Sequence, residues 1–283
     1  MPRASARLTQ KMAMVCVWAT GAITVFALLV IIGYTLYRGL PHVGWSFLTT
    51  PPRGGTSGAG GISTVIVATL YLMGLTLVIL VPLGVGAAVY LAEYAPDNRL
   101  TRLIRFGTEV LAGVPSIVFG MFGFALLVIA LHFKFSILSG ALTLVCLLLP
   151  TLIRTSEEAI KAVPRSYREA ALALGATKWQ TTWRVTLPAA IAGIATGIIL
   201  CIGRAMGETA ALYVTMGGTT ALPTSLLSSG RTLAVHLYYL ATVTNNLDGA
   251  FAVGVILIIV IVVTNSITTW LSQRFRGRMA GGA

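Results

Sequence analysis

The sequence predicts an all-α membrane protein with six transmembrane helices. Hydrophobic residues make up 56% of the 283 positions and charged residues only 10%, whereas soluble domains carry about 25% charged residues. Six apolar runs are each long enough for a helix to cross a bilayer, which takes about 20 residues. The Lys and Arg residues between these runs are distributed unevenly, and this distribution predicts the orientation of the helices.

The six apolar runs cover residues 12–37, 65–90, 114–131, 135–153, 189–214 and 251–271. The first run follows a basic segment, but it exceeds the roughly 7–15 apolar residues of a signal peptide, so we expect it to be retained as a helix. Pro82 should kink the second run, because proline lacks a backbone donor. The third and fourth runs are joined by a very short turn, which predicts an antiparallel pair.

The positive charges predict that both termini lie in the cytoplasm. With the N-terminus inside, the inner segments hold 15 of the 20 Lys and Arg residues and the outer loops hold four, as the positive-inside rule requires. Residues 1–13 should then be a cytoplasmic tail, 14–273 the transmembrane domain and 274–283 a second cytoplasmic tail. Residues 38–63 and 217–248 should be outer loops, and 93–109 should lie on the inner membrane surface.

Composition and motifs argue against several other classes of protein. The net charge of +12 comes from basic residues scattered between apolar runs, so it does not form the continuous basic face of a nucleic-acid binder. The three cysteines stand singly inside apolar runs, without the spacing of a disulfide framework or metal site. No glycine-rich phosphate-binding loop of the GxxxxGK[ST] type is present, so we do not expect this chain to hydrolyse ATP itself.

A polar stretch, residues 154–188, separates the fourth and fifth runs and should lie in the cytoplasm. It contains three pairs that fit a helix-capping box: Thr155 with Glu158, Ser166 with Glu169, and Thr177 with Gln180. Helix breakers follow in the same order: Pro164, Gly175 and Pro188. The stretch therefore predicts three short helices near residues 156–163, 167–174 and 178–185.

The same stretch carries a family motif. Glu169-Ala170-Ala171, then three residues, Gly175, nine residues and Val185-x-Leu187-Pro188 resembles the EAA motif of ABC importer permeases, with valine where isoleucine is usual. The resemblance implies a type I ABC importer permease whose EAA coupling loop, 154–188, docks into a separate ATPase subunit. The ATPase-coupling residues would be Glu169, Ala170, Ala171 and Gly175. From the residues alone, the alanines could equally be simple helix formers.

Four further segments point to one branch of that family. YLAEYAP (90–96), VPSIVFG (114–120), RAMGETAAL (204–212) and TPPRGG…GGI (50–62) resemble phosphate-import permeases, the last of them the PstA type. The resemblance implies a permease subunit in the bacterial cytoplasmic membrane that imports inorganic phosphate by alternating access. Its partners would be a PstC-like second permease, PstB-like ATPase subunits that bind ATP and Mg²⁺, a PstS-like phosphate-binding protein and membrane lipid. The chain itself would bind no cofactor.

Arg204 and Glu208 form the clearest ionisable pair inside a predicted span. Charges in the bilayer are costly and usually functional, and the i, i+4 spacing would place both on one helix face. Arginine suits phosphate through two charge-assisted hydrogen bonds, and the carboxylate could accept the phosphate proton and repel sulfate. Alternatively, the two neutralise each other or pair with a partner subunit. Ser116 could add a hydroxyl to this substrate route, and the resemblance places Arg204 on it.

Other readings remain open from the sequence. A permease for another oxyanion, such as sulfate or molybdate, would share the EAA loop. A secondary transporter would not need that loop, and a membrane enzyme would need a reactive cluster that the scattered histidines do not form. Two GxxxG pairs, Gly193 with Gly197 and Gly203 with Gly207, could pack against a partner subunit or against another helix of this chain.

Overall fold

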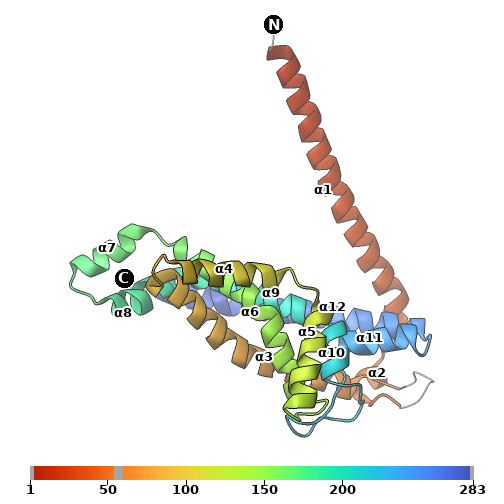
Figure 1. Cartoon of the computed structure of the whole chain (residues 1–283). Helices are drawn as coiled ribbons and strands as arrows, with labels where there is room; N and C mark the ends of the chain where they lie inside the picture. The colour runs from red at the N-terminus through yellow and green to blue at the C-terminus, as the bar shows by residue number, and fades with distance from the viewer. Residues whose placement is uncertain (1–2, 54–59, 281–283) are drawn as a thin grey trace.

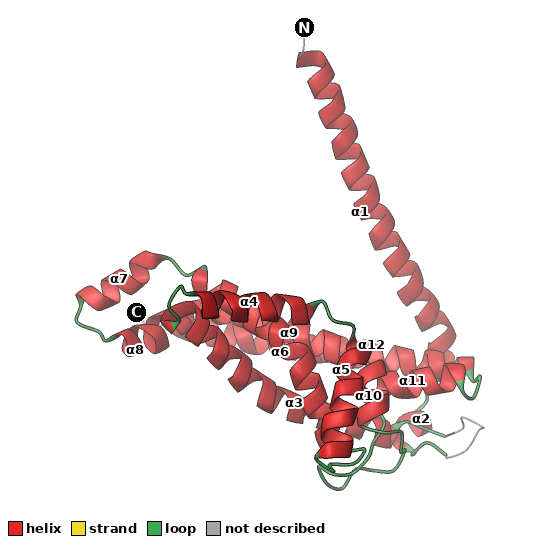
Figure 2. Ribbon diagram, viewed as in Figure 1, coloured by secondary structure: helices red, strands yellow, loops and turns green. Residues whose placement is uncertain are grey.

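The computed structural model describes residues 3–53 and 60–280, and in these residues the chain is helical (Figures 1 and 2). The helices are α1 (Arg3–Gly39), α2 (Trp45–Thr49), α3 (Ser63–Val89), α4 (Arg99–Ala112), α5 (Ser116–Gly123), α6 (Ile137–Lys161), α7 (Arg165–Ala173), α8 (Lys178–Thr181), α9 (Leu187–Met206), α10 (Ala210–Thr215), α11 (Leu233–Thr242) and α12 (Leu247–Ala280). Short π-helical segments extend α3 at Tyr90–Tyr94, extend α5 at Phe124–Ala130 and join α8 to α9 at Thr182–Thr186. The predicted all-α class is confirmed.

Within residues 3–53 and 60–280, five helical segments are long and apolar enough to cross a membrane: Thr9–His42, Ser63–Tyr94, Ile137–Lys161, Lys178–Met206 and Leu247–Trp270. A sixth crossing exists only if α4 and α5 with its extension form one span, bent by 103°. The predicted third run therefore supplies only the second half of this bent pair. The segment predicted to lie on the membrane surface supplies the first half.

The bend between α4 and α5 has a local cause. Gly113 ends α4, and Pro115 stands immediately before α5. Proline lacks a backbone N–H and disfavours helical geometry at the preceding residue, here Val114. The apolar pattern continues through the break, so hydropathy alone does not mark it.

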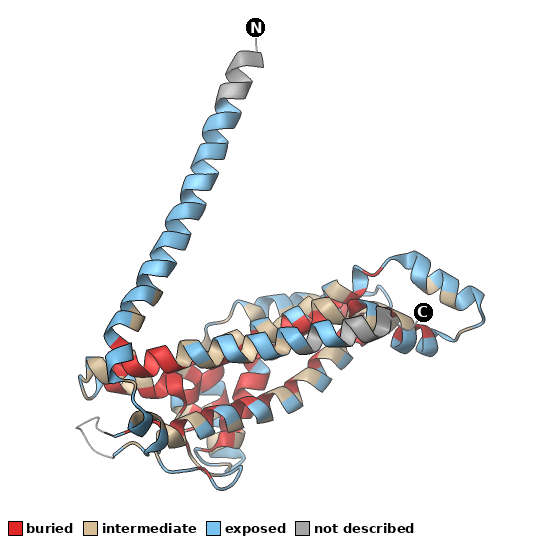
Figure 3. Ribbon diagram, turned by 180° about the vertical axis from the view of Figure 1, so that it is seen from behind, coloured by how far each residue is buried: buried red, intermediate tan, exposed pale blue. Residues whose placement is uncertain are grey.

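The core lies between α3, α6, α9 and α10 (Figure 3). Its centre is formed by large buried side chains: Leu72, Leu80, Leu144, Leu148, Ile202 and Leu212. Glycines bring α9 close to α6, because a Cβ at Gly193 would lie 2.5 Å from the Cβ of Ala159. Gly197 faces Thr155 in the same way. This GxxxG pair thus packs within the chain and not against a partner subunit.

Helix α1 stands away from the body of the protein (Figure 1). Its C-terminal end is anchored, where the ring of Tyr34 meets Phe251 edge-on with 5.5 Å between centroids and Gly39 abuts the Phe251 backbone. Its most apolar 18-residue window is 0% buried. The helix therefore presents apolar surface on all sides, to lipid or to another membrane protein.

The predicted outer loops contain helices that the sequence did not indicate. Residues 217–248 include α11, whose N-terminus is capped by the hydroxyl of Thr232 accepting from the Val235 N–H. Residues 38–63 include α2. Part of the TPPRGG…GGI segment, residues 54–59, lies outside the described residues.

Candidate substrate route and docking loop

The fifth predicted span is broken next to its two charged residues. Helix α9 ends at Met206, with Gly207 as its C-cap, and α10 begins at Ala210. Arg204 therefore lies in the last turn of α9, whereas Glu208 lies in the break. The prediction that both charges share one helix face is wrong, because the glycine ends the helix between them.

Glu208 is turned into the protein. Glu208 is only 9% exposed, and its carboxylate accepts a hydrogen bond from the Ala211 N–H at 3.1 Å. A carboxylate that satisfies an otherwise unpaired N–H at a helix start stabilises that helix. Glu208 thus positions α10 directly after the break.

Arg204, in contrast, is exposed on the subunit surface. All eight Asp and Glu side chains lie in the described residues, and none of them forms an ion pair with Arg204. Arg204 and Glu208 therefore do not neutralise each other in this structure. The guanidinium remains open to a substrate or to a second subunit.

Ser116 is brought into the neighbourhood by packing between half-helices. It opens α5, and α5 lies against α10, where a Cβ at Gly120 would be 2.7 Å from the Ala211 Cα. The breaks before α5 and before α10 thus interrupt two helices that pack on each other. Within the described part of the chain, no hydrogen bond or ion pair joins Ser116 to Arg204 or Glu208.

The polar stretch forms a projection at the opposite end of the molecule from the loops around α2, with α7 at its tip (Figure 1). Gly175 has a φ of +83°, as expected of a glycine that follows a helix C-terminus. The predicted capping box of Thr177 and Gln180 is present, with both hydrogen bonds formed. Glu169 and Ala170 are exposed, and Ala171 is half-buried.

Other predictions for this stretch are corrected. The first short helix does not exist separately, because α6 continues to Lys161 and the Thr155 hydroxyl donates back to the Thr151 carbonyl. Ser166 does not cap α7, which starts after Pro164 without a side-chain cap. Pro188 stands at the start of α9, as predicted for the boundary with the fifth run. It does not break the helix there, because the segment Thr182–Thr186 joins α8 to α9 and proline is tolerated in the first turn of a helix.

One arginine ties α7 to the body. Arg168 donates from Nε and Nη2 to one oxygen of Glu93, at 3.0 and 2.7 Å. It also donates to the carbonyls of Val163 and Ile160, at 2.7 and 2.8 Å. The Arg168 and Glu93 side chains are only 20% and 9% exposed. This contact links the docking loop to the ends of both α3 and α6.

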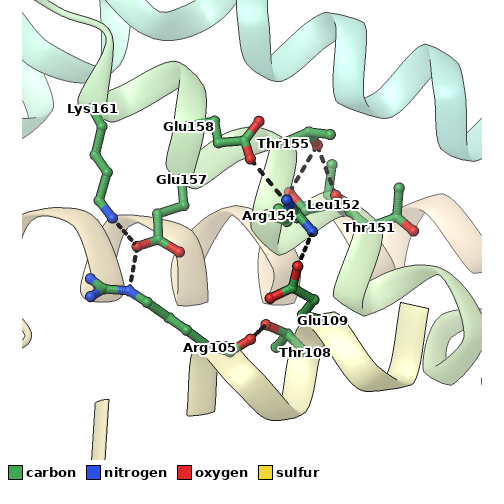
Figure 4. Close-up of polar contacts among 10 residues, drawn as sticks. All are labelled: Arg105, Thr108, Glu109, Thr151, Leu152, Arg154, Thr155, Glu157, Glu158 and Lys161. Atoms are coloured by element: carbon green, nitrogen blue, oxygen red, sulfur yellow. Dashed lines mark hydrogen bonds and ion pairs between the residues drawn. The ribbon is translucent and has the colours of Figure 1, made fainter. Parts of the chain in front are cut away.

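A second polar cluster joins α4 to α6 (Figure 4). Glu157, 10% exposed, accepts from Arg105 at 2.8 Å and from Lys161 at 2.6 Å. Arg154 bridges Glu109 of α4 and Glu158 of its own helix. The i, i+4 spacing of the Arg154–Glu158 and Glu157–Lys161 pairs was visible in the sequence, but the contacts to α4 depend on the fold.

Comparison with known proteins agrees with this architecture. Residues 80–277 match the family model described as binding-protein-dependent transport system inner membrane component. A solved chain of a bacterial ABC transporter involved in the import of the acidic polysaccharide alginate has the same fold, with a TM-score of 0.67 and 17% identity over 91% of this chain and 95% of that one.

Two curated relatives are closer in sequence. The probable ABC transporter permease protein YqgI of Bacillus subtilis is 37% identical over 94% of this chain and 95% of that protein. Phosphate transport system permease protein PstA 1 of Mycobacterium tuberculosis is 45% identical over 56% of this chain, a match that spans 52% of that relative. The chain therefore belongs to the family of binding-protein-dependent transport system inner membrane components, the integral membrane permeases of ABC importers.

Proposed function

We propose that this chain is the permease subunit of an ATP-driven importer of inorganic phosphate. The observation that carries the proposal is Arg204, an exposed guanidinium with no carboxylate partner, in the last turn before the break in a membrane helix. Broken membrane helices commonly form substrate sites near the bilayer midplane. The likeness to phosphate transport permeases supports phosphate as the anion that Arg204 meets.

Import would proceed by alternating access. Arg204, with a second, PstC-like permease subunit completing the site, would first face a PstS-like phosphate-binding protein on the outer side and then face the cytoplasm. Glu208 and Ser116 belong to this route through their places at the starts of α10 and α5. Glu208 already accepts a hydrogen bond from an N–H of α10. Its main role would therefore be to position α10, and its second role would be to accept the phosphate proton.

Coupling to ATP would pass through the docking loop. Glu169, Ala170, Ala171 and Gly175 would seat α7 in PstB-like ATPase subunits, which bind ATP and Mg²⁺ and reside on the cytoplasmic side of a bacterial inner membrane. Exposed apolar side chains on and beside α7 support a protein partner there: Tyr167 at 54%, Leu172 at 50% and Leu174 at 89% exposure. The Arg168–Glu93 contact would carry motion of the loop to α3.

The experiment is a phosphate-dependent ATPase assay on the importer purified with its partner subunits. Phosphate-loaded binding protein should stimulate hydrolysis in the unmodified assembly and fail to do so with Arg204→Ala, while Arg99→Ala, which removes another exposed arginine, behaves normally. Equal stimulation of the Arg204→Ala assembly would refute the role of Arg204. Stimulation by sulfate but not by phosphate would favour the second candidate, an importer of another oxyanion.

Glu208 is tested separately by two substitutions. Glu208→Gln keeps an oxygen that can accept from the Ala211 N–H, whereas Glu208→Ala removes it. If the carboxylate contacts phosphate, the glutamine variant should lose preference for phosphate over sulfate. If it only positions α10, glutamine should behave like glutamate and only alanine should lower uptake.

A further inference from the structure

Arg231 lies in a cavity of about 490 Å³ on the predicted outer side of the protein. The cavity lies between α10, α11 and the loops that precede α6 and α11. Its lining includes Tyr213 of α10, Gly217 and Ser229 of the connecting loop, and Tyr239 of α11. None of these residues belongs to the Arg204 route or to the docking loop.

The charge of Arg231 is not neutralised by the protein. All eight Asp and Glu side chains fall in the described residues, and none of them lies within ion-pair distance of Arg231. The Nε atom is buried without a hydrogen-bond partner. Burial lowers the pKa of Arg231, but a guanidinium stays protonated in proteins. A partly buried cation without a counter-charge is costly, and this cost favours a bound anion.

The groups that touch Arg231 orient it without balancing its charge. The guanidinium carbon lies 4.1 Å from the centroid of the Tyr239 ring. One Nη atom is 3.4 Å from the Nδ1 of His236. Burial, with the nearby Arg231, lowers the pKa of His236 to about 4, so at neutral pH the imidazole is uncharged and can accept from Arg231. Stacking on one face leaves the edge of the guanidinium to bind a further ligand.

The rest of the cavity offers the polar groups that an oxyanion needs. Thr219 supplies a hydroxyl to its lining, and Tyr213 and Tyr239 supply phenols. The Ser229 hydroxyl also lines the cavity, but it donates to the Met216 carbonyl at 2.9 Å. Gly217 has a φ of +90°, a backbone conformation that side chains other than glycine rarely adopt. Gly218 leaves Arg231 uncovered, because a Cβ there would lie 3.6 Å from an Nη atom.

We propose that the Arg231 cavity, defined by Arg231, Tyr213, Ser229 and Tyr239, is a second oxyanion-binding site of this chain, separate from Arg204. Its ligand is a phosphate-type oxyanion, either free inorganic phosphate or the phosphate of a lipid headgroup. If the ligand is free phosphate, the role of the Arg231 cavity as an outer capture site before Arg204 rests on the proposed function. Binding of the anion to the cavity does not depend on that function.

The test uses the full chain purified in a detergent without phosphate groups. Inorganic phosphate and sulfate are titrated at constant ionic strength while thermal unfolding is followed, since a ligand that binds the folded protein raises its stability. Native mass spectrometry of the same samples counts retained phospholipids. Arg231→Met and Arg231→Lys are compared with Arg53→Met, which removes an exposed arginine on the same predicted side.

Arg231→Met should raise the apparent dissociation constant of the anion at least tenfold, or should abolish phospholipid retention, while Arg53→Met does neither. Loss of inorganic phosphate binding identifies the free anion, and loss of phospholipid identifies the headgroup. Arg231→Lys keeps the positive charge but lacks the planar guanidinium, so its anion affinity should lie between those of the unmodified chain and Arg231→Met. If Arg231→Met and the unmodified chain show the same anion dissociation constants and the same bound lipid, the site does not exist. Because no partner, ATP or transport enters this measurement, that result is distinguishable from failure of the phosphate-import proposal.

Discussion

Replacing Arg168 with methionine should detach α7 from the body of the permease without unfolding the membrane helices. Arg168 makes two hydrogen bonds to one oxygen of Glu93 and two to the carbonyls of Val163 and Ile160. Methionine keeps much of the aliphatic length but removes all four. The matched control is Arg165→Met on the same helix, where the side chain is exposed.

The size of the effect follows from burial. With the Glu93 side chain only 9% exposed, removal of its partner leaves a nearly buried charge uncompensated, which typically costs about 3–5 kcal/mol. Arg168 is 20% exposed, and water can partly replace it, so we take the lower end, about 3 kcal/mol. Because α7 lies at the edge of the structure, this cost should appear as local opening. At about 1.4 kcal/mol per tenfold change, opening should increase roughly a hundredfold.

Hydrogen–deuterium exchange measured by mass spectrometry can follow this opening. In the Arg168→Met variant, peptides that cover residues 163–176 should exchange about a hundredfold faster, whereas peptides from α3 and α9 stay protected. Arg165→Met should resemble the unmodified chain. Glu93→Gln combined with Arg168→Met should cost less than the two single changes added, because both remove the same contact. Equal exchange in Arg168→Met and Arg165→Met would refute the anchoring role.

Three further substitutions test other features. Gly197→Ala should destabilise the protein by about 1–3 kcal/mol, because the new methyl group would lie 3.1 Å from the Cβ of Thr155. The control is Gly203→Ala, which has nothing within 4 Å of the new methyl group and should leave thermal unfolding unchanged. Thr177→Val should cost α8 about 1 kcal/mol by removing one half of its capping box, seen as faster exchange in 177–181 but not in α7. The folded-state pKa of His236, about 4, lies below the ordinary histidine pKa of 6.5. Neutral His236 therefore contributes its full stabilisation above pH 6.5, and this contribution is lost as the pH falls toward 4. Thermal unfolding between pH 7 and pH 4 should therefore be less pH-dependent in His236→Gln than in the unmodified chain; an equal slope would rule out His236 as the group responsible.

The features that the sequence predicted well are those set by local chemistry. Apolar length located the long helices, Gly175 marked the end of α7, and the Thr177–Gln180 box marked the start of α8. Where a local signal competed with a longer helix, the helix prevailed. The hydroxyl of Thr155 bonds within α6 instead of starting a new helix, because Ser156, Glu157 and Ile160, which follow it in α6, are buried.

The features that the sequence could not predict depend on tertiary packing. The break after Arg204 falls inside a continuous apolar run, and a glycine such as Gly207 is also common within membrane helices. That Glu208 turns inward to hold α10 while Arg204 turns outward follows from that break. The Arg105–Glu157 contact joins residues 52 positions apart in the sequence, and no local pattern relates them.

The most direct test of phosphate import is uptake of radiolabelled phosphate into proteoliposomes that contain this chain, a second permease subunit and the ATPase. Uptake should require external binding protein, internal ATP and the ATPase subunit, and it should be lost with Arg204→Ala. Uptake by this chain at the same rate without ATP or the ATPase, or uptake of sulfate in place of phosphate, would contradict the proposed function.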